Sequence, residues 1–111
     1  MEGKMRLLIV ASNEEFFRKL NKLGKHYNVE CVRSSSEAIA TMREGSYEAV
    51  IVHSNLGLGS VSTVLDYTKR DGRISSFLVS DGDHRREAEE EGARFLFEEE
   101  LFENSEKSRI W

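Results

Sequence analysis

The residues that could do chemistry stand where apolar runs end. Residues 50–52 lead directly into His53, a second run ends at Ser80, and a third ends at Ala11 and Ser12. A histidine at such a point could accept a phosphoryl group, bind a metal ion, or be a polar residue satisfied at the end of a strand. No second His, Cys or carboxylate stands at metal-ligand spacing from it, so the sequence favours the third interpretation.

Three serines are candidate nucleophiles, namely Ser54, Ser60 and Ser80. None of them lies in a Gly-x-Ser-x-Gly elbow. No histidine and acid can be placed beside any of them from the sequence. We therefore expect no catalytic residue, and we predict that the chain is not an enzyme.

The loop Gly57-Leu58-Gly59 resembles a nucleotide-binding loop only superficially. A dinucleotide fingerprint follows the first strand and opens its helix, whereas here the first strand leads into a segment without glycine. The groups left to hold an anion there are Ser12, Asn13 and the N-terminus of the following helix. A nucleotide- or flavin-binding domain stays the alternative. Asp81-Gly82-Asp83 is typical of a turn and a helix cap rather than of a metal pair. We expect no cofactor and no metal ion.

Apolar runs alternate with helical patterns along the chain. Strands are predicted at residues 5–10, 27–32, 47–53, 74–79 and 94–97, with a helix after each and the last helix over about 99–109. Ser12, Ser34 and Ser60 are the predicted caps of the first three helices. Five strand–helix pairs with short connections imply a parallel sheet covered on both faces by right-handed crossovers. Its strand order is expected to be flavodoxin-like, 2-1-3-4-5, or a truncated Rossmann order.

Composition limits the partners. The 111 residues suffice for one domain. The net charge of −4, from 16 basic and 20 acidic residues, argues against a nucleic-acid surface. No stretch approaches the ~20 apolar residues of a membrane span. The single cysteine, Cys31, lies in an apolar strand, which indicates an inert buried thiol and a reducing cytoplasm.

Four segments in this order resemble a CheY-like response-regulator receiver domain. They are Leu7-Leu8-Ile9-Val10, Ser36-Glu37-Ala38-Ile39, residues 47–52, and Glu87-Ala88-Glu89-Glu90-Glu91-Gly92-Ala93. The resemblance spans residues 5–102. It implies a flavodoxin-like three-layer α/β sandwich with a five-stranded parallel sheet of order 2-1-3-4-5. Residues 1–111 would then form a single receiver-like domain of bacterial two-component, or phosphorelay, signal transduction.

The resemblance also implies a phosphorylation site, most of which is missing here. In the family, two acids after the first strand and an aspartate after the third hold magnesium, and that aspartate accepts the phosphoryl group. A Ser or Thr after the fourth strand and a lysine after the fifth bind the phosphoryl group. The matching positions are Ala11, Ser12, His53, Ser80 and Glu99. Glu98 takes the lysine position if the fifth strand is one residue shorter than usual. We therefore expect a degenerate pseudo-receiver, because magnesium prefers carboxylates and a glutamate repels phosphate.

The output of such a domain is implied to lie on the face formed by the fourth helix, fifth strand and fifth helix. The partner-face candidates are Arg85, Arg86, Glu89, Phe95, Glu98, Ile110 and Trp111. We expect a protein partner, which could be a signalling kinase, an effector, a fused domain or a second copy in a weak homodimer. We expect neither nucleic acid nor a membrane to bind. The predicted function is thus a cytoplasmic, phosphorylation-independent protein-interaction module.

Overall fold

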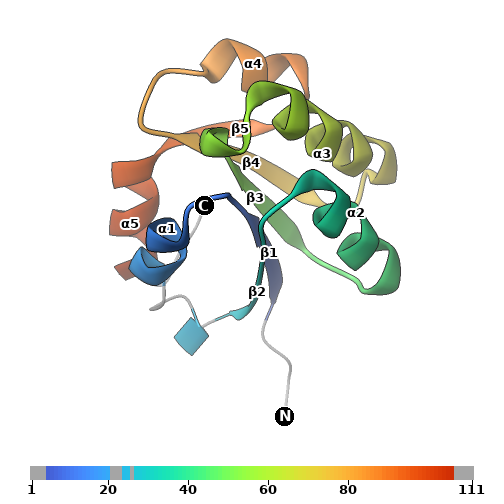
Figure 1. Cartoon of the computed structure of the whole chain (residues 1–111), viewed down its shortest axis with the longest axis horizontal. Coiled ribbons are helices and arrows are strands. Elements are labelled where there is room, and N and C mark those ends of the chain that lie inside the picture. Colours follow the sequence, from blue (N-terminus) through green and yellow to red (C-terminus); the bar gives the residue numbers. More distant parts are fainter. Residues whose placement is uncertain (1–4, 21–23, 26, 107–111) are drawn as a thin grey trace.

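The computed structural model describes residues 5–20, 24–25 and 27–106 (Figure 1). The elements are β1 (Arg6–Val10), α1 (Glu14–Lys19), β2 (Asn28–Val32), α2 (Ser35–Glu44), β3 (Ala49–His53), the 3₁₀ turn η2 (Ser54–Leu56), α3 (Leu58–Asp71), β4 (Ser75–Ser80), α4 (Arg85–Glu90), β5 (Arg94–Phe97) and α5 (Glu98–Glu106). Within the described part of the chain, no helix is long and apolar enough to cross a membrane.

The five strands form one parallel sheet in the order β2-β1-β3-β4-β5. The flavodoxin-like order is therefore confirmed, and the truncated Rossmann order is not observed. His53 is level with Val79 on β4, and Ser80 is level with Phe97 on β5. Because parallel strands end at the same edge of a sheet, these side chains meet at its carboxyl edge.

Helices cover both faces of the sheet, as the continuous apolar runs predict. Figure 1 shows α1 and α5 on one face and α2 and α3 on the other. Alternate residues of β1 pack on opposite faces of the sheet. Leu7 and Ile9 pack in the core beneath α1 and α5, whereas Leu8 and Val10 pack beneath α2, α3 and α4. All four side chains are fully buried.

The N-terminus of α2 is capped as predicted, but that of α1 is not. Ser34 accepts a hydrogen bond from the Glu37 backbone N–H at 3.1 Å. At α1 the cap is Asn13 rather than Ser12, and its Oδ1 accepts from the Glu15 N–H at 2.8 Å. Asparagine is as good a cap as serine. The hydroxyl of Ser12 is thereby left for another partner.

The helix α3 begins two residues before the predicted cap. Its N-cap is Gly57, whose φ of 95° lies in the region that favours glycine. Ser60 therefore lies inside the first turn and is not the cap. The buried side of α3 consists of Val61, Val64, Leu65 and Thr68, which recur at helical spacing.

The edge strand β2 corrects one prediction. Of its five residues only Val32 is buried, and Cys31 is exposed rather than buried. β2 is an edge strand of the sheet and pairs with β1 on one side only. An apolar run at a sheet edge does not by itself bury a thiol.

Candidate functional site

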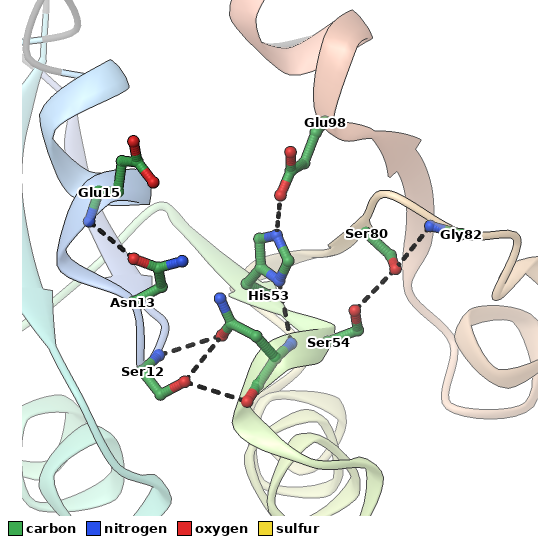
Figure 2. A network of polar contacts seen from close by, with 9 residues as sticks. Ser12, Asn13, Glu15, His53, Ser54, Ser80, Gly82 and Glu98 are labelled. Atoms are coloured by element: carbon green, nitrogen blue, oxygen red, sulfur yellow. Dashed lines mark hydrogen bonds and ion pairs between the residues drawn. The ribbon is translucent and has the colours of Figure 1, made fainter.

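His53 ends β3 and lies in a polar network at the carboxyl edge of the sheet (Figure 2). Its side chain is buried, with 3% of the residue exposed. Nδ1 accepts a hydrogen bond from the Asn55 backbone N–H at 3.0 Å, so the proton of the neutral ring is on Nε2. Nε2 contacts Oε2 of Glu98. The Phe16 ring packs edge-on at 4.6 Å between centroids. Both ring nitrogens are thus engaged within the protein.

Local backbone geometry explains why Nδ1 finds a donor. The chain turns into η2 directly after β3, and the first N–H groups of a helical turn lack partners within it. His53 occupies the N-cap position of η2, where its ring supplies the missing acceptor to Asn55. The imidazole therefore acts as a cap on one side and as a link to α5 on the other.

Glu98, rather than Glu99, faces His53. Because β5 ends at Phe97, α5 begins with Glu98, and its first side chain is directed into the site. Glu99 is exposed and lines, with Asp81, Phe97, Glu98 and Glu100, a cavity of about 290 Å³ beside the site. At this edge of the sheet a base thus ends β3, and an acid follows β5.

Ser12 connects the loop after β1 to η2. Its backbone N–H donates to Oδ1 of Asn55 at 3.1 Å, and its hydroxyl donates to the Asn55 carbonyl at 3.0 Å and lies 3.3 Å from Oδ1. The sequence interpretation missed Asn55. Its position in a loop directly after a strand, two residues beyond the candidate His53, is the signal that could have identified it.

Ser80 is fully buried and ties β4 to β3. Its hydroxyl oxygen accepts hydrogen bonds from the Ser54 hydroxyl at 2.7 Å and from the Gly82 N–H at 3.1 Å. Ser54 is the first residue of η2. Within the described ranges no hydrogen bond joins Ser54, Ser60 or Ser80 to a histidine. The pair of hydroxyl and base that activates a serine nucleophile is therefore not assembled there.

The groups that a nucleotide- or flavin-binding site would need after β1 are already in use. Ser12 is bonded to Asn55, and Asn13 caps α1. α1 itself has only six residues. The geometry gives this alternative no support.

A stack of side chains joins α4 to β5 on the candidate partner face. The Arg85 guanidinium carbon lies 5.4 Å from the centroid of the Phe97 ring, a cation–π distance. Phe97 in turn packs edge-to-face on Phe95 at 5.0 Å. Both rings are half-buried, and Phe95 also packs against the core beneath α4. Phe97 therefore contributes to this face.

The other partner-face candidates differ in how far they are available. Arg86 and Glu89 are exposed on α4. Glu98 is directed at His53, and its side chain is 26% exposed. Ile110 and Trp111 lie outside the described residues.

No protein-family model matches the sequence, and no curated protein matches it. Solved structures do match. The receiver domain of the response regulator NarL from Mycobacterium tuberculosis has a TM-score of 0.79 at 14% identity, with 96% of this chain and 94% of that chain covered. The chain has the fold of a receiver domain. A receiver domain of an HD domain-containing protein from Pseudomonas fluorescens gives a TM-score of 0.75 at 20% identity, with 95% and 94% covered.

A third receiver domain was solved together with a partner. It is that of the Saccharomyces cerevisiae response regulator Ssk1, in complex with the histidine phosphotransfer protein Ypd1. The TM-score is 0.70 at 19% identity, with 87% of this chain and 80% of that chain covered. These likenesses agree in the fold.

The magnesium ion that the receiver fold implies does not fit the residues at this edge. Ala11 offers a buried methyl group, the Ser12 hydroxyl is bonded to Asn55, and both nitrogens of His53 are engaged. Magnesium prefers carboxylate and other hard oxygen ligands. Elsewhere in the described ranges, no group of three or more His, Cys, Asp or Glu residues is arranged to hold a metal ion.

Proposed function

We propose that this chain is a receiver-like protein-interaction module of bacterial signal transduction, which works in the cytoplasm without phosphorylation and has no catalytic chemistry of its own. The observation that carries the proposal is the state of His53. The resemblance to receiver domains assigns this residue to the phosphoacceptor position, yet it is buried and both of its nitrogens are bonded inside the protein. The scaffold is intact, whereas the reactive group is replaced by a structural one.

The electrostatics of the site also oppose phosphorylation. A phosphoryl donor brings negative charge, and Glu98 places a carboxylate where a receiver needs a lysine. The exposed carboxylates of Asp81, Glu99 and Glu100 line the neighbouring cavity. Transfer of a phosphoryl group to His53 would have to proceed against these charges without a fitting magnesium site.

Binding to a protein partner is a function that such a scaffold can perform without a reactive site, because a fold does not by itself determine function. Ssk1 is seen with the phosphotransfer protein Ypd1, and another similar receiver belongs to an HD domain-containing protein. For this chain we assign the partner surface to α4, β5 and the start of α5. Exposed charges at Arg86 and Glu89 flank the stack of Arg85, Phe97 and Phe95 there.

Self-association is the test that needs no unknown partner. Two copies related by a two-fold axis would pair Arg85 and Arg86 with the opposite charges of the same face. Exposed ion pairs contribute about 0–1 kcal/mol each, so the homodimer should be weak and sensitive to salt. Sedimentation velocity should show it at low salt, and acetyl phosphate should leave it unchanged.

The matched variants are two double charge reversals. Arg85→Glu with Arg86→Glu should abolish self-association, whereas Lys69→Glu with Arg70→Glu should not. Lys69 and Arg70 are exposed at the end of α3 and give the same change in net charge. If the two variants self-associate to the same extent, the partner surface is wrongly assigned to α4, β5 and the start of α5. Deletion of Ile110 and Trp111 tests separately whether an apolar end contributes.

A further inference from the structure

We propose that a proton is the input signal of this domain. Protonation of His53 would break the hydrogen bond that holds η2 and thereby release the loops at the carboxyl edge of the sheet. This regulatory role rests on the proposed function for its output. The molecular step itself depends only on the geometry of the site in Figure 2.

Protonation would break this hydrogen bond because it places two donors, the Asn55 N–H and a new Nδ1–H of His53, opposite each other. Nδ1 of His53 accepts from the Asn55 N–H at 3.0 Å, and an imidazolium carries N–H on both nitrogens. When Nδ1 gains a proton from solvent, its lone pair forms the new N–H bond and can no longer accept the hydrogen bond from Asn55. The Asn55 N–H then points at another donor, so η2 must shift. Nε2 keeps its proton and its contact with Glu98, now as an ion pair.

The same turn carries the contacts that join the neighbouring loops. Asn55 is bonded to Ser12 in the loop after β1. Ser54 donates to Ser80, which accepts from Gly82 in the loop that leads to α4. A shift of η2 would therefore strain or break bonds to two other loops. One of these loops ends at the helix that carries Arg85 and Arg86, so protonation is coupled to the proposed partner face.

The charged groups near His53 are mainly carboxylates, which favour the protonated form of a histidine. The ring contacts Glu98 of α5 and the Phe16 ring of α1. The first turn of α1 also carries Glu14 and Glu15, both exposed, and Glu14 is paired with Arg33. From the loop after β4, Asp81 lines the cavity next to Glu98.

No lysine or arginine among the described residues forms an ion pair with Glu98. The positive charge of an imidazolium would therefore be balanced by this carboxylate. Histidine is the side chain that ordinarily titrates in the physiological range. The site thus combines a histidine that lies against a carboxylate with a hydrogen bond that a second ring proton would break.

The test is a pH titration of the ¹⁵N-labelled chain by NMR, from about pH 8 to about pH 5, around the ordinary pKa of histidine. Ring ¹⁵N shifts show which nitrogen of His53 gains a proton, and hydrogen exchange gives the protection factor of the Asn55 amide. We expect Nδ1 to be protonated and the protection factor to fall by about tenfold in the same pH range. His53→Asn should abolish the response, and His84→Asn should preserve it.

Two results would overturn the inference. In the first, the proton binds Glu98 and leaves Nδ1 unprotonated. In the second, Nδ1 is protonated while the protection of Asn55 stays constant. The measurement on the native chain decides even if His53→Asn does not fold. The NMR titration is carried out on the free chain, so its result does not depend on self-association. If the chain responds to pH but neither self-associates nor binds a partner, the proposed function is wrong and the protonation step still stands.

Discussion

His53 at the end of β3 contacts Glu98 at the start of α5, so a base and an acid meet across the carboxyl edge of the sheet. Their sequence separation is 45 residues, and the histidine side of the pair is buried. In the receiver pattern the same two positions hold an acid and a base in the opposite order. The contact therefore links the end of β3 to the start of α5.

The stability of the fold should depend on Glu98 more than on its neighbour Glu99. Glu98→Ala leaves the Nε2–H of a buried histidine unpaired, which costs about 1–3 kcal/mol. Glu99→Ala removes an exposed side chain and should change the unfolding free energy by less than about 0.5 kcal/mol. Both variants lose one negative charge in the first turn of α5, so the comparison cancels the helix-dipole contribution. Urea denaturation measures the difference, and equal losses would show that the contact contributes nothing.

Replacing His53 itself should be costlier than expected for a polar residue at a strand end. His53→Asn loses the contact with Glu98 and the edge-on packing against Phe16. We expect a loss of about 2 kcal/mol in unfolding free energy. His84→Asn, at the N-cap position of α4 where the side chain makes no capping bond, is the control and should cost less than about 0.5 kcal/mol. A thermal or urea midpoint of His53→Asn equal to that of the control contradicts this account.

The contact between Ser12 and Asn55 should protect a single amide. Asn55→Ala removes the Oδ1 acceptor of the Ser12 N–H, whereas Asn55→Asp keeps an oxygen at that position. Amide hydrogen exchange at Ser12 should therefore become about tenfold faster in the alanine variant and stay near the native rate in the aspartate variant. If both variants exchange at the native rate, the side chain of Asn55 does not hold this loop.

At the opposite end of the sheet, Tyr47 should titrate only in strong alkali. Burial of the ring, and then the hydrogen bond to Glu30 at 2.6 Å together with the charge of that carboxylate, raise the pKa of Tyr47 from 10.0 to about 12. The unfolded chain loses this proton first, so stability should fall as the pH rises from about 10 through about 12. Absorbance of the tyrosinate, taken as the difference between the native chain and Tyr47→Phe, reports the midpoint. A midpoint near 10 in the folded protein would contradict the buried environment.

The fold was predictable because its signals are local and repeated. The apolar run of β1 predicts a strand buried on both faces, and the bounds of β5 agree with the prediction. The buried side of α3 follows from its helical spacing. The exposed Cys31 was missed, since the coverage of an edge strand depends on how far helices reach and not on the strand's own residues.

The site was predictable in its positions but not in its contacts. His53 and Ser80 were identified because each ends an apolar strand. The choice between Glu98 and Glu99 depends on one residue of strand length, and one residue turns a helical side chain by about 100°. The bond between Ser12 and Asn55 spans 43 residues. Such long-range partners cannot be deduced from spacing along the chain.

The most direct test of the central claim is incubation of the chain with magnesium and acetyl phosphate, followed by intact-mass measurement at neutral pH. We predict no gain of a phosphoryl group by the native chain. The variant His53→Asp should also remain unmodified, because Ala11, Ser12 and Glu98 still provide neither a magnesium site nor a cation for the phosphate. A stoichiometric gain of one phosphoryl group by the native chain, lost in His53→Asn, would contradict the account.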